Sequence, residues 1–398
     1  MSRASIFDRL SERPEPASAA QAPAARRHDF RTDRLRLVDG LALTPAGLVA
    51  AGEVPAPARL AQSRELHGPD GFRLLVQAVP EVVPEPAPGL DAKAQRLQAL
   101  LQGVLVDALM LLDALPEGEG FDIVLSAPLR TAAAEVVTDG LRRAVAATEL
   151  ARGLGELRHL AAGQDPHAAL AAPDGQGHVL WLVVDSLLNL EDIAALHRRD
   201  RLALPTRQAG LYPGEAAVAL LMQRVPEGGE GGEDEPGASA PGWWLDAAIR
   251  REHPGRSTLG AAARQRLVAE LLAQAWPAGE GGEDDPPAFL VVDSLGLPGR
   301  TQELVGPLLA RWPALDIIEQ GLGVDTWGGW PGEALTALQL ALARAALAPG
   351  ESALLLGLAE ETGTRALTLR ACDEAATDDA PATTDDHPAT PPADRRRS

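Results

Sequence analysis

Few residues of this 398-residue chain could carry out covalent group transfer. The chain has one cysteine, Cys372, and eight histidines. A thiol or hydroxyl activated by a neighbouring imidazole is the usual nucleophile for such a reaction. However, the segment 149–185, which contains His159 and His167, has no cysteine, serine or threonine. We therefore interpret these two histidines as surface or helix-end residues and expect no catalytic nucleophile beside them.

Other chemical motifs are also absent from the sequence. No group of cysteines and histidines has the spacing of a zinc site. No phosphate-binding glycine-rich loop follows a predicted strand. The acidic GEGGE segments do not place their carboxylates at the spacing of an EF-hand loop. We therefore predict no catalytic residue, no metal site and no cofactor.

Two short acidic motifs end apolar segments. The sequence LVVDSL occurs at 182–187 and again at 290–295, so that Asp185-Ser186 and Asp293-Ser294 follow the same apolar run. An apolar run of this length bounded by polar residues is typical of a buried strand. The pattern therefore predicts both pairs at strand ends. Whether the echo is an internal repeat or a coincidence stays open.

Strand and helix patterns alternate along the chain, which predicts a sheet covered by helices. Period-2 and short apolar segments predict strands, among them 121–126 and 178–184. Periodicity near 3.6 predicts helices, among them 91–115, 156–170, 257–276 (with Ser257 as N-cap) and 190–199, which Asn189 would cap. The final segments 352–358 and 365–371 predict a hairpin.

One turn is more specific than these patterns. Gly214-Glu215-Ala216-Ala217 opens the apolar segment 218–222 and follows the Asp185-Ser186 motif. Together they resemble a landmark of the thiolase-like superfamily, and of β-ketoacyl synthases in particular. Three weaker matches follow the family's order: 37–47 resembles its opening strand and turn, 323–347 its glycine-rich turn (Asp325, Gly328) and long helix, and 354–369 its last hairpin with Gly363.

The resemblance implies a fold and a domain organisation. The fold is α/β, a five-layer α-β-α-β-α unit with two related halves. One domain would span 34–372, with halves at about 34–223 and 240–372. The family's paired subunits imply a homodimer, and we place its edge near 121–126.

The resemblance also implies where catalytic residues should lie. The family's cysteine would precede the strand 178–184, and its histidines would lie in the C-terminal half. Residues 149–185 hold no thiol, and no histidine occurs between His253 and His387. Cys372 follows the last predicted strand and does not match the nucleophile position. The chain therefore resembles a degenerate ketosynthase, and we expect that it is not an enzyme.

Proteins with such eroded sites are encoded in bacterial type VI secretion clusters, which implies a function. We expect a non-catalytic adaptor or chaperone, with a basic effector or spike-type protein as partner. The alternatives are a β-ketoacyl synthase-like acyltransferase and a pseudo-subunit of a ketosynthase pair.

Charge and composition limit the remaining classes. A net charge of −20 argues against a nucleic-acid binder. Most of the charge imbalance comes from two loops, 226–240 and 278–287, and from the tail 373–398. We expect these segments and the arm 1–33 to be disordered. No apolar run reaches the roughly 20 residues that span a bilayer, and no secretory leader is visible. We expect a cytoplasmic protein without a membrane partner.

Tryptophan is scarce in this chain, so the pair Trp243-Trp244 is notable. Tryptophans commonly anchor interfaces. Two interpretations stay open, namely a strand that packs against the core and a protein interface.

Overall fold

A computed structural model describes the chain in six ranges: 30–80, 82–116, 118–207, 209–226, 242–278 and 285–372. The segments expected to be disordered lie mostly outside these ranges. They are 1–29 of the arm, 227–241 and 279–284 of the acidic loops, and the tail 373–398. The expected boundary of the arm at residue 33 is wrong, because residues 30–33 already belong to the first strand.

The first half-sheet has five main strands. Three of them run parallel and the last two are each antiparallel to the strand before them. Helices and strands cover both of its faces, which explains why β7 is buried at every residue. In spatial order the strands are β6 (Leu154–Leu160), β5 (Phe121–Ser126), β7 (His178–Ser186), β8 (Glu215–Pro226) and β1 (Phe30–Thr44).

The second half-sheet repeats this connectivity. Its first three strands are parallel and the next two pairings are antiparallel. The shared order shows that β5, β6, β7 and β8 correspond to β11, β12, β13 and β14. In spatial order the strands are β12 (Gly321–Gly323), β11 (Phe289–Val292), β13 (Ala353–Gly357), β14 (Gly363–Ala371) and β9 (Trp243–Asp246).

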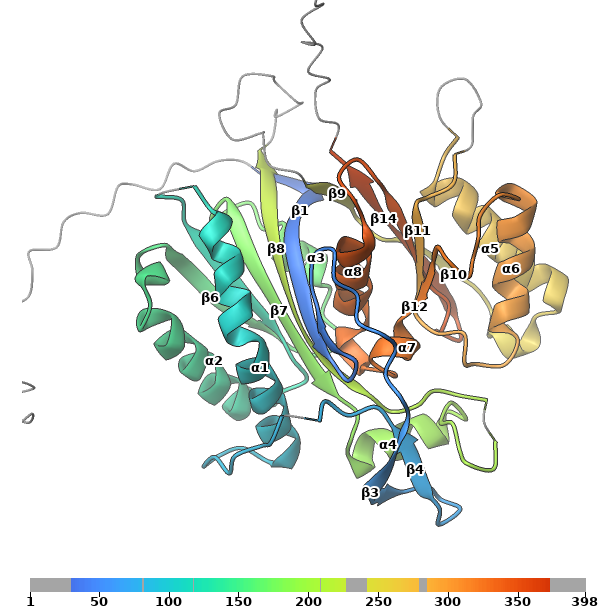
Figure 1. The fold of residues 1–398 in the computed structure, drawn as a ribbon, viewed down its shortest axis with the longest axis horizontal. Helices are drawn as coiled ribbons and strands as arrows, with labels where there is room; N and C mark the ends of the chain where they lie inside the picture. The colour runs from blue at the N-terminus through green and yellow to red at the C-terminus, as the bar shows by residue number, and fades with distance from the viewer. Residues whose placement is uncertain are drawn as a thin grey trace, which may run out of the picture.

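Strand β9 joins the two halves. It pairs with β14 on one side and with β1 on the other, so the strands form one twelve-stranded sheet. Two short strands complete it, β2 (Gly47–Val49) beside β1 and β10 (Ile249–Glu252) beside β14. The sheet bends so that its halves face each other (Figure 1).

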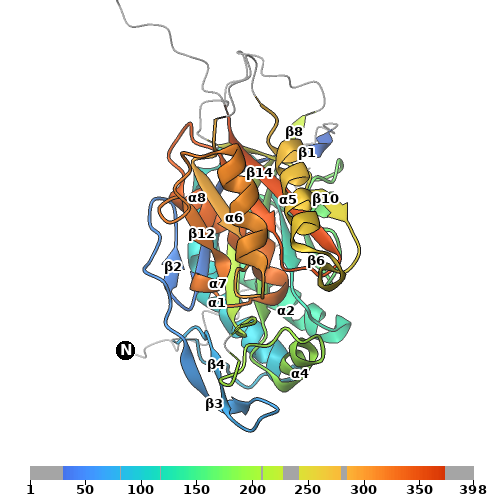
Figure 2. The same cartoon turned by 90° about the vertical axis from the view of Figure 1, so that its right-hand side faces the viewer.

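Helices form the other three layers, as Figures 1 and 2 show. The layer between the half-sheets contains α8, which is buried on almost every side and packs against both of them. Two apolar clusters fix the outer layers, one on each half-sheet. The expected five-layer α-β-α-β-α fold with two related halves is therefore confirmed. The outer layer on the first half-sheet holds α1 (Ala92–Met110) and α2 (Thr131–Ala146). The middle layer holds α3 (Pro166–Leu170) and α8 (Leu335–Ala346), and the outer layer on the second half-sheet holds α5 (Ala261–Ala275) and α6 (Arg300–Arg311).

Helix α1 and the 3₁₀ turn after it have the length and hydropathy of a membrane-spanning helix, at Ala92–Ala114 with a mean hydropathy of 1.5. In the fold, seven residues of α1 are buried, and six of them belong to the apolar cluster that packs on the first half-sheet. Because 33% of the most apolar window is buried, packing in the core accounts for part of this apolar composition.

The remaining elements lie beside the C-terminal ends of the parallel strands. They are a small hairpin of β3 (Ala61–His67) and β4 (Arg73–Val76), and the helices α4 (Leu190–Arg198) and α7 (Val324–Trp327). Asn189 caps α4 as expected, because its side chain accepts a hydrogen bond from the backbone N–H of Asp192 at 3.0 Å.

Three local expectations are wrong. The predicted helix at 156–170 is the strand β6 followed by the short α3. Ser257 does not cap α5, which begins at Ala261 after Gly260; it lies in a separate 3₁₀ turn. The strand at 121–126 is not an edge, because β5 lies between β6 and β7, and β6 is the outermost strand of that half-sheet.

Trp243 and Trp244 start β9. Trp243 is 1% exposed, and its indole N–H donates to the carbonyl of Glu351 at 2.9 Å. Trp244 is half-buried and lies under the guanidinium of Arg34. Trp243 is therefore part of the core, and only Trp244 keeps a partly exposed face.

Candidate functional site

The landmark residues of the first half gather around one buried carboxylate. Glu215 is fully buried where β8 begins, and it lies opposite Ser186 at the end of β7. The Ser186 hydroxyl donates to Glu215 at 2.8 Å, and the backbone N–H of Val79 donates at 2.8 Å. Arg96 of α1 forms an ion pair with the same carboxylate. Glu215 thus ties α1 and the 77–79 segment to two central strands.

The same turn brings the two halves into backbone contact. The N–H of Gly214 donates to the carbonyl of Trp330 at 3.2 Å. A Cβ on Gly214 would overlap the Gly328 carbonyl oxygen and lie 2.8 Å from its carbon. This close approach explains why Gly214 has no side chain. The two glycine-containing turns, far apart in the sequence, therefore form one structural unit.

Asp185 lies beside Glu215 and is 2% exposed. It accepts hydrogen bonds from the backbone N–H groups of Ser186 at 2.7 Å and of Glu333 at 2.9 Å. Lys93 lies 3.4 Å from it and 2.5 Å from Asp192. Burial raises the pKa of Asp185 to about 6, although the charge of Lys93 acts in the opposite direction.

Asp293 and Ser294 reproduce this local geometry at the end of β11. Asp293 accepts from the N–H groups of Ser294 at 2.7 Å and of Ala359 at 2.8 Å. The Ser294 hydroxyl donates to Asp325 at 2.8 Å, as Ser186 donates to Glu215. Burial raises the pKa of Asp293, which is 2% exposed, and also that of Asp325.

The echo in the sequence is therefore a repeat of local structure, and both pairs lie at strand ends as predicted. It is not a repeat of the two halves. The strand β7 corresponds in connectivity to β13, whereas β11 corresponds to β5. In both places the Asp carboxylate accepts from the N–H of the following serine and from one backbone N–H of a distant segment, Glu333 for Asp185 and Ala359 for Asp293.

A pocket of about 190 Å³ lies where these strand ends meet the start of α8. Three carboxyl groups reach it, from Asp293, Glu333 and Glu360, together with the hydroxyl of Thr336. One cation, Arg365, lines it, and its charge acts on Asp293. The described residues that line this central pocket include neither a thiol nor an imidazole.

The residues considered as nucleophile or base lie elsewhere. Helix α3 occupies the position that α8 has in the second half, and the loop before it reaches Glu333 through the N–H of Gly163 at 3.3 Å. His167 lies inside α3, and His159 Nε2 donates to the carbonyl of Ala127, beside a separate pocket of about 440 Å³. Cys372 follows β14 at its far end, where its N–H donates to Gly242. The structure therefore does not bring these three residues together.

Gly363 is the last of the landmark residues along the chain. It starts β14, opposite Glu252 of β10, and a Cβ there would contact the Glu360 carboxylate at 2.7 Å. The cations Lys93 and Arg96, which hold Asp185 and Glu215, were not predicted. Two signals were available in the sequence. The two cations are spaced three residues apart on a predicted helix, and Lys93 is the only lysine of the chain.

No protein-family model matches the chain, and no curated protein matches it. Solved structures do. OleA E117D from Xanthomonas campestris is 14% identical and has a TM-score of 0.48, with 86% of this chain and 99% of that one covered. The ishigamide ketosynthase/chain length factor is 14% identical at a TM-score of 0.48, covering 86% and 100%. The 3-oxoacyl-(acyl carrier protein) synthase III, FabH, from Xanthomonas oryzae is 14% identical at 0.47, covering 86% and 99%. Likeness at this level concerns the path of the chain and gives no residue a role.

Proposed function

We propose that this protein is a thiolase-like protein that has lost the condensing-enzyme nucleophile and works by binding another protein, as an adaptor or chaperone. The observation that carries the proposal is the composition of the central pocket. Its described lining has carboxyl groups where acyl transfer needs a thiol and imidazoles. The two-half connectivity and the Gly214–Gly328 contact support the assignment to the superfamily.

The inventory of nucleophiles around the pocket favours a non-catalytic role. Covalent acyl transfer needs a nucleophile that a base or its position activates. Thr336 is the one hydroxyl in the described lining, and Asp293 beside it is held by backbone N–H groups with its pKa raised. A carboxylate whose oxygens already accept from backbone N–H groups is less available as a base for a threonine hydroxyl. On this proposal the fold is kept, while the described lining of the pocket lacks an activated nucleophile.

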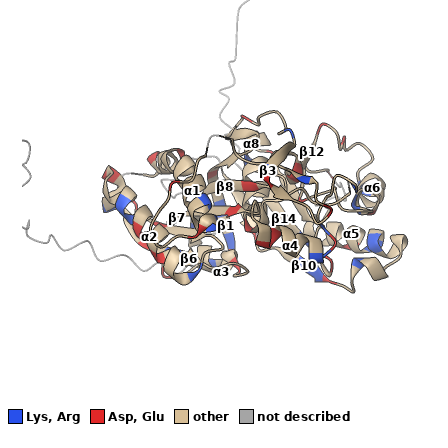
Figure 3. Ribbon diagram, turned by 90° about the horizontal axis from the view of Figure 1, so that it is seen from below, with Lys and Arg blue, Asp and Glu red and all other residues tan. Residues whose placement is uncertain are grey.

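The partner we propose is a basic protein met in the cytoplasm, of the effector or spike type associated with type VI secretion. The net charge of −20 favours fast association with a basic surface. Over the described residues, acidic and basic side chains are interspersed along the ribbon (Figure 3). The charge imbalance therefore comes mainly from the acidic loops and the tail, and these are the segments we propose as the contact.

The test is incubation with acetyl- and malonyl-thioesters, followed by intact-mass analysis and an assay of free thiol. We expect no adduct and no turnover. Cys372→Ala is the control, because Cys372 is the only thiol and could acylate without enzymatic help. Turnover that survives Cys372→Ala would refute the non-catalytic role, and its loss in Thr336→Val would then identify the nucleophile.

A second candidate is a pseudo-subunit that pairs with an active ketosynthase or with its own copy. The observation that favours it is β6, which among the described strands pairs only with β5 and leaves its outer edge open. An open edge is a ready template for another strand. Light scattering at micromolar concentration should then report a dimer, or co-expression should yield a mixed dimer. A monomer in both experiments would exclude this candidate.

A further inference from the structure

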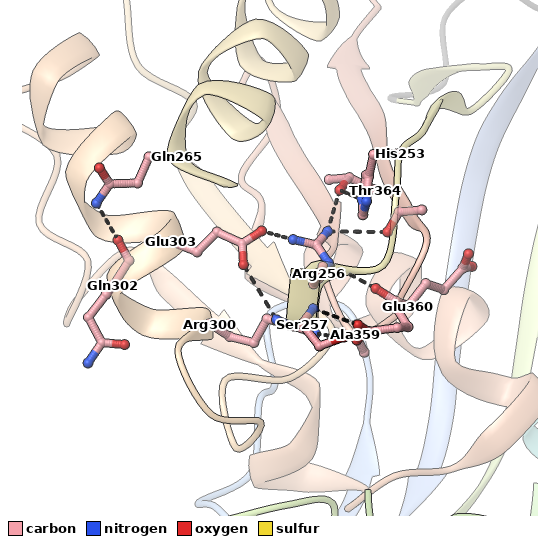
Figure 4. Close-up of polar contacts among 12 residues, drawn as sticks. His253, Arg256, Ser257, Gln265, Arg300, Gln302, Glu303, Ala359, Glu360 and Thr364 are labelled. Carbon is pink, nitrogen blue, oxygen red and sulfur yellow. Dashed lines mark hydrogen bonds and ion pairs between the residues drawn. The ribbon is translucent and has the colours of Figure 1, made fainter. Parts of the chain in front are cut away.

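A cluster of buried charges lies outside the central pocket, where the loop before α5, the start of α6 and the β13–β14 turn meet (Figure 4). Its centre is Arg256, which is 1% exposed. Arg256 donates to the carbonyls of Glu360 at 2.9 Å and Gly363 at 3.2 Å, and to the Thr364 hydroxyl. Its remaining nitrogen forms an ion pair with Glu303. Arg256 is therefore fully used in holding the turn to α6.

Arg300 is less well satisfied, although it is only 5% exposed. Its nearest carboxylate oxygens are those of Glu303 at 3.5 Å and Glu361 at 3.8 Å. Charge-assisted hydrogen bonds are normally about 2.7–2.9 Å long. Its Nε has no hydrogen-bond partner among the described residues. A buried guanidinium is thus held at a distance from both of its counter-charges.

Two more arginines face the same region. Arg264 of α5 makes no ion pair with a described residue, and its buried Nε has no hydrogen-bond partner there. Its Nη1 would lie 3.1 Å from a Cβ at position 299, beside Arg300. Arg201 stacks on Trp330 at 5.2 Å and donates to the carbonyl of Ala359, but its Nε is likewise buried without a partner in the described chain.

Among the described residues, few carboxylates lie within ion-pair distance of these arginines. Glu303 pairs with Arg256 and Arg300, and Glu361 pairs with Arg300 and also accepts from the N–H of Ser257. Burial lowers the pKa of Arg300; Glu361 and Asp293 act in the opposite direction, and repulsion from Arg264 and Arg201 lowers it further. Buried guanidinium donors without a partner are unfavourable unless an anion completes them.

The geometry points to an oxyanion site in which Arg264, Arg300 and Arg201 bind the phosphate group of a small ligand at the start of α6. The helix has 12 residues, and its N-cap Gly299 offers no side-chain acceptor to the first turn. The helix dipole favours an anion there, and forked guanidinium donors suit a phosphate. Gly299 has φ of +81°, which favours glycine, and the missing side chain leaves room beside Arg264. The three Nε–H groups without a partner in the described chain match the oxygens of a phosphate better than the two oxygens of a single carboxylate. This site does not depend on the non-catalytic role proposed above.

Calorimetric titration of the full chain with inorganic phosphate, at constant ionic strength in chloride, tests the site. We expect saturable binding at one site. Arg264→Ala should weaken it about tenfold or more, as expected for the loss of one charge-assisted interaction. Arg266→Ala is the matched control, because Arg266 is exposed on the same helix two residues later, and it should bind as the wild type does.

Acetate provides a second arm and thermal unfolding a second measurement. Acetate should bind more weakly than phosphate, and equal binding would overturn the assignment to a phosphate group. Without phosphate, Arg264→Ala should unfold at a higher temperature than the wild type, because a repelling charge is gone. No saturable phosphate binding to the wild type, or equal weakening in the Arg264 and Arg266 variants, would overturn the site itself.

Discussion

Replacing the buried carboxylate of Glu215 tests whether the Gly-Glu-Ala-Ala turn is a structural centre of the fold. In Glu215→Gln the shape is kept, but the negative charge between Arg96 and the Ser186 hydroxyl is removed. The amide oxygen can still accept from Val79, while the amide nitrogen faces two donors. Removing one partner of a buried ion pair typically costs about 3–5 kcal/mol. Arg96 keeps 18% of its side chain exposed, so we expect the lower end, about 3 kcal/mol.

Urea unfolding, followed by circular dichroism and by tryptophan fluorescence, measures the loss. A double-mutant cycle with Arg96→Met isolates the pair, and the double variant should be more stable than the sum of the single changes predicts by about 2 kcal/mol. Glu191→Gln, at an exposed position of α4, is the control and should change stability by less than about 0.5 kcal/mol. A loss below about 1 kcal/mol for Glu215→Gln, or additive single changes, would refute the reasoning.

Two further outcomes follow from the same region. Gly214→Ala should destabilise the protein by about 3 kcal/mol in urea unfolding, because its Cβ meets backbone atoms of Gly328 that cannot rotate away. The control is Gly140→Ala, which has open space in α2 and should stabilise the protein by about 0.5–1 kcal/mol. Equal effects of the two substitutions would contradict this reasoning. Burial raises the pKa of Asp185 from 3.8 to about 6, so between pH 3.8 and about pH 6 the folded state binds more protons at this residue than the unfolded state does. The contribution of Asp185 to the free energy of unfolding should therefore fall by about 3 kcal/mol as the pH rises through that window. Asp185→Asn should remove this part of the pH dependence, and an unchanged slope between pH 4.5 and 6.5 would show that burial does not raise the pKa.

Several elements were predictable from local pattern alone. The strand 121–126 has the predicted bounds, because its apolar residues are bounded by glycine and by a polar turn. Helix α4 begins where Asn189 predicts, since an N-cap acts within its own turn. The buried strand after Gly214 was also predictable from local pattern, because a continuous apolar run needs cover on both faces.

The segment 156–170 was not predictable in this way. Its spacing of apolar residues favours a helix, yet residues 154–160 form the edge strand β6 beside β5. Strand formation depends on a neighbour that supplies hydrogen bonds, and the paired residues of that neighbour, such as Val124 opposite Arg158, are 34 positions away in the sequence. The Ser257 cap failed for a related reason, because the backbone N–H of Ser257 donates to Glu361 of the distant hairpin turn.

The sequence by itself determined the alternating α/β pattern, the absence of a nucleophile from 149–185 and the Asp-Ser pairs at strand ends, because each depends on residues close together in the chain. Tertiary structure alone decided which of these residues meet. It joined Gly214 to Gly328, placed Arg96 on Glu215, and gathered Arg201, Arg264 and Arg300 around one helix start. Contacts between segments far apart in the sequence are fixed by packing, and packing leaves no periodic trace in the sequence.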